Sequence, residues 1–256
     1  MSDLRYVLVP GGGGSAHDWH RVVPLLEARG HEAVAVGLPA ADPGAGLERY
    51  ADVVVEAIGD HPHVVVVAHS MGALSAPLAC ARRPVDLLVL LAPMVPAPGE
   101  RGSDWWAAVG QPEAAASLAR EQGRDPDVFD EDALFWHDVP PEVVAEAVAH
   151  AGDEVGAFEE PWPLDAWPDV PTRVVACRED RLLPLDLVRR FTRDRLGVHP
   201  DETDGGHMAA LSRPAELVDL LEWIRWQEAR RSAASRPGRR QGDGLGSAPT
   251  SKEAPA

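Results

Sequence analysis

The stretch Val64-Val65-Val66-Val67-Ala68-His69-Ser70-Met71-Gly72-Ala73 decides the fold of this chain. Four consecutive valines predict a strand that is covered on both faces, as in a parallel sheet between two layers of helices. The next residues fit a sharp turn from strand to helix, because Ala68 and Gly72 are small enough for the backbone to pass close to itself beside Ser70. Such a turn would present the Ser70 hydroxyl at the carboxyl end of the sheet, as a nucleophile requires.

Strand and helix signals alternate around this stretch and indicate an α/β fold with a doubly wound, mostly parallel sheet. Short apolar runs predict about six strands, at residues 6–9, 33–36, 64–67, 87–91 and 173–177, with a weaker one near 197–203. Between about 93 and 169 we expect no strand, and helical candidates begin near Ser103, Pro112 and Pro141. We interpret this segment as a helical cap inserted into an α/β domain that spans residues 1–226.

The last thirty residues, 227–256, are rich in Arg, Ser, Gly, Ala and Pro, with Leu245 as their only large aliphatic side chain. This composition cannot bury enough apolar surface to offset the entropy of ordering, so we expect a disordered tail. The helix before it is predicted to start at Pro214, with Ser212 as its cap.

Composition limits the classes of function. The chain has 256 residues and a formal net charge of -17, which argues against a protein that binds nucleic acid through a basic surface. No apolar run approaches the roughly 20 residues that span a bilayer, so no membrane association is expected. Two cysteines are too few for a disulfide framework and no signal peptide is visible, so a cytoplasmic location is expected. Oligomeric state is not indicated.

A serine nucleophile needs a base, and the base needs an acid that orients it. Among ten histidines His207 is the best candidate, because the glycines of Asp204-Gly205-Gly206-His207-Met208 let a loop carry the imidazole toward Ser70. Asp180 follows the predicted fifth strand at the same end of the sheet as Ser70, with Glu179 as its local rival. These residues predict a proton-relaying triad.

The glycine loop Gly11–Ala16 admits two interpretations. Read as G-x-G-x-x-A, it would bind the pyrophosphate of a dinucleotide in an oxidoreductase, but Gly37 stands where an acidic residue should hold the ribose. Read as part of a hydrolytic site, the loop supplies a backbone N–H that stabilises an oxyanion, and we favour this interpretation.

The two donors of that oxyanion hole would come from different segments. The N–H of Met71 lies at the start of the helix after Ser70, where negative charge is favoured. For the second donor we favour Gly12, with Gly11 and Gly13 as alternatives. The pairs His17/His20 and His61/His63 have loosely ligand-like spacing, but neither pair belongs to a recognisable metal-binding motif with cysteine or acidic partners, so we expect no metal.

Together these segments resemble the α/β hydrolases, and most of all the small-esterase branch that includes plant methylesterases and hydroxynitrile lyases. The resemblance covers roughly residues 5–226 and rests on Leu8–Gly12, Trp19, Val23–Leu26, Gly30–His31, Ala68–Gly72, Cys177–Asp180 and Gly206–Ala209. It implies that Ser70 is the nucleophile, His207 the base and Asp180 the acid, with no cofactor and a helical cap over a mostly apolar pocket. Pro10 departs from the histidine usual in this branch, and Ala68 from its usual glycine.

The same resemblance separates two reaction types. The lyases of the branch place a lysine after the catalytic histidine and a threonine in the oxyanion loop, where this chain has Met208 and Gly11, and its only lysine is Lys252. We therefore expect a serine hydrolase that cleaves a small carboxylic ester through an acyl-enzyme. A non-catalytic ligand-binding protein on the same scaffold is the alternative, and ester, thioester and lactone carbonyls fit equally. The substrate pocket is expected to be lined by Gly11, His69, Trp105, Trp106, Phe135, Trp136 and Met208, although the aromatic residues also suit ordinary cap packing.

Overall fold

A six-stranded sheet forms the centre of the computed structural model, which describes residues 4–152 and 156–235. The strands are β1 (Arg5–Val9), β2 (Glu32–Ala35), β3 (Val64–His69), β4 (Leu87–Leu91), β5 (Thr172–Cys177) and β6 (Asp201–Thr203). Their order is β2-β1-β3-β4-β5-β6, and every neighbouring pair is parallel. The predicted fold class is confirmed, with the weak last strand reduced to three residues.

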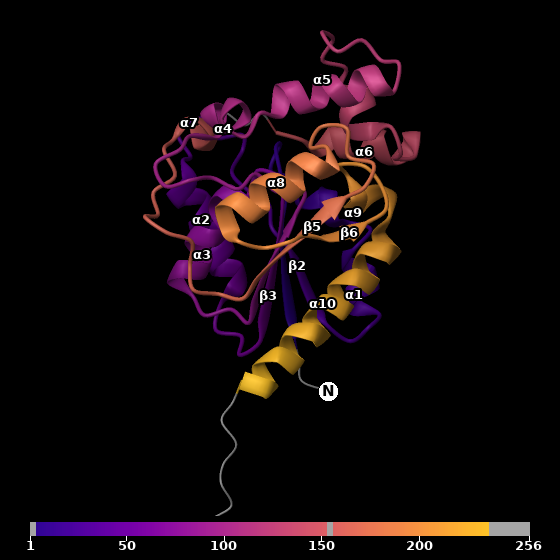
Figure 1. Ribbon diagram of the computed structural model, residues 1–256. Coiled ribbons are helices and arrows are strands. Elements are labelled where there is room, and N and C mark those ends of the chain that lie inside the picture. Colours follow the sequence, from indigo (N-terminus) through magenta and orange to yellow (C-terminus); the bar gives the residue numbers. More distant parts are fainter. Residues whose placement is uncertain (1–3, 153–155, 236–256) are drawn as a thin grey trace, which may run out of the picture.

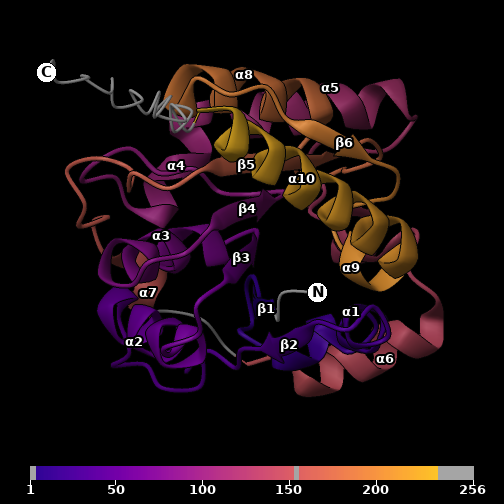
Figure 2. The same ribbon diagram turned by 90° about the horizontal axis from the view of Figure 1, so that it is seen from below.

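Helices cover both faces of the sheet, which explains why β3 is apolar at every position. Val64 and Val66 pack into a core shared with helices α2 and α3, whereas Val65 and Val67 pack into a second core shared with α1 and α10. Figure 2 shows α2 and α3 on one side of the sheet and α1 and α10 on the other. The flanking helices are η1 (Ala16–Trp19), α1 (Val23–Glu27), α2 (Leu47–Ile58), α3 (Gly72–Arg82), α8 (Leu185–Leu196), α9 (Ala209–Ser212) and α10 (Pro214–Ser235).

A group of helices lies between β4 and β5 in the chain and covers one end of the sheet (Figure 1). These elements, which we call the cap, are α4 (Gly102–Val109), α5 (Gln111–Glu121), the π-helix η2 (Asp132–Trp136), α6 (Pro141–His150) and α7 (Gly156–Glu159). Within the described part of this segment the only β pairing is an isolated bridge between Arg101 and Pro161. The helix starts expected near Ser103, Pro112 and Pro141 correspond to α4, α5 and α6.

The carboxyl-terminal helix begins at Pro214 as predicted, but its end and its cap differ from expectation. Helix α10 continues to Ser235, so residues 227–235 are helical rather than disordered. Their Ala, Arg, Glu and Gln residues are good helix formers, and Glu228 pairs with Arg231 one turn later (2.5 Å) and with Arg173 of β5 (2.8 Å). The predicted cap Ser212 instead ends α9, and its Oγ has no hydrogen-bond partner among the described residues. The rest of the expected tail, residues 236–256, lies outside the described residues.

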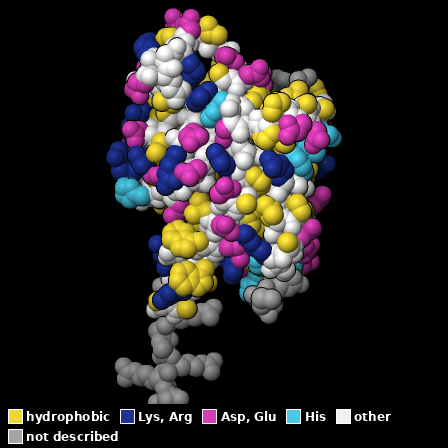
Figure 3. All heavy atoms as spheres, turned by 90° about the vertical axis from the view of Figure 1, so that its right-hand side faces the viewer, with side chains coloured by type: hydrophobic (Ala, Val, Ile, Leu, Met, Phe, Trp, Pro, Cys, Tyr) yellow, Lys and Arg dark blue, Asp and Glu magenta, His cyan; other side chains and the backbone are white. Residues whose placement is uncertain are grey.

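The surface around α10 mixes charge with exposed apolar groups. On the face in Figure 3 acidic and basic side chains are interleaved, and hydrophobic side chains gather toward the end of α10. Trp223 and Trp226 are 44% and 49% exposed, and the guanidinium groups of Arg173 and Arg230 lie over their rings. Among the described residues, no helix combines the length and the apolar character that crossing a membrane requires.

Candidate active site

Ser70 stands on a strained turn between β3 and α3. Its φ of +50° lies in the left-handed region that residues with a side chain rarely adopt, and it is one of two such non-glycine residues in the described chain. Gly72 makes the turn sterically feasible, because a Cβ there would lie 2.5 Å from the carbonyl oxygen of Pro10. The small residue after the serine is therefore required by the close approach of the loop after β1.

Ser70, His207 and Asp180 come together although they lie far apart in the sequence. The Ser70 hydroxyl donates to His207 Nε2 (3.0 Å), and His207 Nδ1 donates to Asp180 Oδ2 (2.8 Å). All three follow parallel strands, so they emerge at the same end of the sheet, and each is buried. This geometry allows a proton to pass from the serine to the imidazole while the carboxylate fixes the imidazole tautomer.

The Asp180 carboxylate is itself held by the backbone. Its second oxygen, Oδ1, accepts hydrogen bonds from the amides of Leu182 (2.9 Å) and Leu183 (2.8 Å). The neighbouring candidate Glu179 is exposed. Its backbone carbonyl oxygen, and not its carboxylate, accepts a hydrogen bond from Nε2 of His137 (3.1 Å). Asp180 is thus the acid that the structure places beside His207.

His69 supports the loop that carries His207. Its imidazole is buried, and this burial together with the nearby His207 ring lowers the pKa of His69 to about 3. The ring is therefore neutral near neutral pH, and its Nε2 hydrogen bonds to the carbonyl oxygen of His207 (3.0 Å). Its role in the structure is to fix the backbone at position 207.

Asp138 of the cap supports the same loop and carries no signal in the sequence. Its Oδ2 accepts a hydrogen bond from the amide of Gly206 (2.8 Å), one residue before His207. Gly206 itself is tightly enclosed, since a Cβ there would lie 2.5 Å from Nε2 of His137 and 2.7 Å from Oδ1 of Asp138. The cap therefore braces the loop of the candidate base.

A pocket of about 270 Å³ opens beside the Ser70 hydroxyl. Its walls come from the glycine loop, from the turns that carry Ser70 and His207, and from the cap. The pocket residues anticipated from the sequence that line it are Gly11, His69, Trp106, Phe135, Trp136 and Met208. The walls are mostly apolar, as expected of a site for a small organic molecule.

Trp105 does not line this pocket, contrary to expectation. Its side chain is fully buried, its Nε1 donates to the carbonyl oxygen of Val95 (2.9 Å), and its ring packs against Phe191 of α8. Adjacent residues on a helix point about 100° apart, so only Trp106 of this pair reaches the pocket. Trp105 instead anchors α4 to the core.

The glycine loop packs directly against the candidate nucleophile. A Cβ at Gly11 would lie 2.9 Å from Cβ of Ser70, so no larger residue fits there without displacement. Gly12 is exposed to the pocket, which Met71 also lines, whereas the carbonyl of Gly13 accepts from Gly152 beyond α6 (2.9 Å). The amides of Gly12 and Met71 therefore belong to residues on the same cavity as the Ser70 hydroxyl.

Asp18 is an unforeseen polar group in the pocket wall. It belongs to η1, is 7% exposed, and burial raises its pKa to about 7. Nothing in the sequence around Asp18 marks it as a pocket residue. It adds a buried carboxyl group to a wall that also includes Glu131.

A second cavity, of about 350 Å³, lies next to the first and is lined almost entirely by the cap. The two cavities share Trp106, Phe135 and Leu182 in their walls, and the second extends along α5 to the exposed Phe129. These shared side chains separate the two spaces.

Comparisons with known proteins agree with this arrangement. The model of the alpha/beta hydrolase family matches residues 6–220. A probable esterase of Oryza sativa subsp. indica is 37% identical over 108 residues, which are 38% of this chain and 41% of that protein. Methylesterase 9 of Arabidopsis thaliana is 35% identical over 97 residues, which are 33% of this chain and 37% of that protein. The chain spans about two fifths of the length of the curated relatives it matches.

Solved structures extend the similarity to most of the chain. The crystal structure of polyneuridine aldehyde esterase superposes with a TM-score of 0.66 at 20% identity, covering 88% of this chain and 100% of that one. The crystal structure of a pyrethroid hydrolase from Sphingobium faniae superposes with a TM-score of 0.68 at 20% identity, covering 90% of this chain and 100% of that one. At this identity the likeness concerns the fold alone.

Proposed function

The chain belongs to the alpha/beta hydrolase family, and we propose that it is a serine esterase that cleaves a small carboxylic ester. The observation that carries the proposal is the pair of hydrogen bonds linking Ser70 to His207 and His207 to Asp180, with Ser70 on a strained turn. Esterase names among its relatives support the same reaction class. A triad of this kind on such a turn activates a hydroxyl for acyl transfer.

In the proposed reaction His207 accepts the Ser70 proton as Oγ attacks the ester carbonyl carbon. Asp180 holds the imidazole tautomer and stabilises the imidazolium that forms. The amides of Gly12 and Met71 donate to the oxyanion of the tetrahedral intermediate. When the C–O bond to the alcohol breaks, His207 returns the proton to the leaving oxygen, and an acyl-Ser70 ester remains. Water then attacks this ester with His207 again as base, which releases the acid and regenerates the hydroxyl.

The pocket favours a compact, uncharged ester. Its volume of about 270 Å³ and its Trp106, Phe135 and Met208 walls suit apolar acyl and alcohol groups. A methyl ester is the first class to test, because the name of a relative, methylesterase, points to a small alcohol. Asp18 in the wall would disfavour a carboxylate on the substrate.

The dinucleotide interpretation of the glycine loop finds no support in the structure. Gly11–Ala16 leads into the four-residue turn η1 rather than a long helix whose N-terminus could bind a pyrophosphate. Gly11 also packs against Ser70. Binding of NAD(P)H that is insensitive to changes at Ser70 would restore that alternative.

A screen of methyl and p-nitrophenyl esters of graded acyl length tests the proposal. We expect turnover by the wild type and a loss of roughly 10³-fold or more in kcat for Ser70→Ala. Ser117→Ala is the matched control, because this serine lies exposed on α5 and bonds only Glu121. Equal turnover by Ser70→Ala and the wild type would refute the assignment, and substrate binding without turnover by either would indicate the non-catalytic alternative.

A further inference from the structure

A cluster of histidines and one glutamate joins the glycine loop to the cap. His17 lies on η1 and His20 directly follows it, while Glu146 and His150 project from α6. The sequence predicts no metal at the first pair because no motif joins these histidines to an acidic or cysteine partner. The fold supplies that partner from the cap, so the reason for expecting no metal there does not hold.

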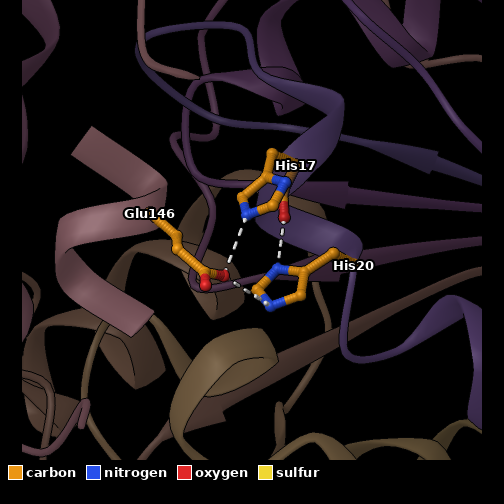
Figure 4. Close-up of side chains that lie close together, drawn as sticks. All are labelled: His17, His20 and Glu146. Carbon is orange, nitrogen blue, oxygen red and sulfur yellow. Dashed lines mark hydrogen bonds and ion pairs between the residues drawn. The ribbon is translucent and has the colours of Figure 1, made fainter. Parts of the chain in front are cut away.

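Three ligand-type atoms converge between these elements (Figure 4). Oε2 of Glu146 lies 3.7 Å from Nε2 of His17 and 3.9 Å from Nε2 of His20, and one ligand atom from each residue lies within 4.8 Å of the others. In a tetrahedral zinc site with bonds of about 2.0–2.1 Å, ligand atoms are about 3.3 Å apart. The Glu146 side chain is 61% exposed and free to move closer to both rings, and a small rotation of the imidazoles would bring the widest separation in the set, which is within 4.8 Å, to the same value.

Backbone carbonyls select the tautomer that a metal ligand needs. His20 Nδ1 donates to the carbonyl oxygen of His17 (2.8 Å), and His150 Nδ1 donates to that of Glu146 (2.7 Å). Each bond leaves Nε2 unprotonated with its lone pair available. A hydrogen bond from the second ring nitrogen to a carbonyl is the usual way in which proteins orient metal-bound histidines.

His17 is the residue that the present contacts leave unsatisfied. Its Nε2 is buried and has no hydrogen-bond partner among the described residues. Its ring stacks between those of His20 (centroids 4.2 Å apart) and His150 (4.1 Å).

We propose that His17, His20 and Glu146 bind one divalent transition-metal ion of the zinc class. Two imidazoles and one carboxylate form a donor set that suits zinc and disfavours magnesium or calcium, which prefer oxygen ligands. A water molecule or Nε2 of the neighbouring His150 completes the coordination. This site is distinct from Ser70 and does not depend on the proposed esterase reaction.

The metal would act as a brace for one wall of the active-site pocket. The glycine loop, Asp18 of η1, and Ala147 and Ala151 at the end of α6 all line that pocket. Between the loop and the segment after α6 the structure already has one backbone bond, from the Gly152 amide to the Gly13 carbonyl. Coordination of ligands from both sides fixes α6 relative to the loop that is proposed to hold the oxyanion.

Calorimetry of zinc binding tests the proposal. The full chain is produced without a polyhistidine tag and is treated with a chelator before the titration. We expect one zinc ion per chain and at least tenfold weaker binding for Glu146→Gln and for His20→Asn. The double variant His61→Ala/His63→Ala is the matched control, because it removes one half-buried and one exposed imidazole elsewhere and should bind zinc like the wild type. With zinc about 100-fold above its Kd, Tm should rise by roughly 5 °C in the wild type and in this control, but not in Glu146→Gln.

Three outcomes would overturn the proposal. The first is absence of zinc binding by the wild type at 100 µM added zinc. The second is equal zinc affinity in the wild type, Glu146→Gln and His20→Asn, which would place the ion elsewhere. The third is equal affinity for zinc and magnesium, which would contradict an imidazole donor set. None of these readouts uses ester turnover, so failure of the esterase proposal leaves the test intact.

Discussion

The loops that carry Ser70, Asp180 and His207 are held in a different way from the cap above them. Each loop extends a strand of the parallel sheet, and the loops of Ser70 and Asp180 are fixed by backbone contacts, namely the close approach of Gly72 to Pro10 and the amides that bind Asp180. The cap reaches the site through side chains, among them Asp138 on the Gly206 amide. We therefore expect the sheet loops to carry the chemistry and the cap to select the substrate and support the His207 loop.

The largest expected effect in the sheet loops comes from the acid. Asp180→Asn should lower kcat by about 10³–10⁴-fold, because an amide in place of the carboxylate stabilises the wrong imidazole tautomer. Glu179→Gln, one residue away and exposed, should retain kcat within about twofold. Steady-state kinetics on one ester would decide, and the reverse ranking of these two variants would remove Asp180 from the triad.

A smaller loss is expected from the glycine loop. Gly11→Ala adds a Cβ 2.9 Å from that of Ser70, which must displace either the nucleophile or the neighbouring amides, and kcat should fall by roughly 10²-fold. Gly37→Ala is a matched control, because its new Cβ would meet only Ala16 at 4.0 Å. If both variants turn over at the same rate, the loop does not contact the reacting centre as described.

The cap should influence turnover through the His207 loop. Asp138→Ala removes the acceptor of the Gly206 amide and should lower kcat about tenfold, with KM nearly unchanged, since hydrogen bonds to charged groups contribute about 1.5–3 kcal/mol. Asp138→Asn retains an acceptor oxygen and should recover most of the loss. Asp132→Ala, exposed on η2, provides a control for the cap. A rise in KM alone would show that Asp138 affects substrate binding instead.

The smallest effect expected is a change of selectivity. Trp106→Ala opens the wall between the cavities of about 270 and 350 Å³, so the ratio of kcat/KM for octanoate over acetate esters should rise several-fold. Trp223→Ala on α10 lies outside both cavity walls and should leave that ratio unchanged. An unchanged ratio in Trp106→Ala would mean that the two cavities do not serve one substrate.

The sequence predicts the sheet-borne part well because each of its features is local. Four consecutive valines predict a strand covered on both faces. The small residues around Ser70 permit a sharp turn, and the glycines before His207 permit a loop. The carboxyl ends of parallel strands then meet at one edge, so chain order alone suggested which side chains meet.

The cap contacts are not predictable in this way, because they join segments that share no local pattern. Asp138 and Asp18 acquire their roles only when the cap packs on the loops, and Glu146 joins the two histidines of η1 for the same reason. Which of two adjacent tryptophans reaches the pocket depends on how α4 is rotated, and this placed Trp105 in the core. The polar composition of residues 227–235 predicts disorder, but their helix propensity and the contacts of Glu228 extend α10 to Ser235.

Covalent labelling tests the central claim most directly, that Ser70 is a nucleophile activated by His207 and Asp180. The wild type, Ser70→Ala and His207→Ala are each treated with a fluorophosphonate, and intact mass and peptide mapping locate the adduct. The account predicts one adduct per wild-type chain, located at Ser70, and none on either variant at the same exposure. An adduct at another residue, or unchanged labelling of Ser70→Ala, would contradict it.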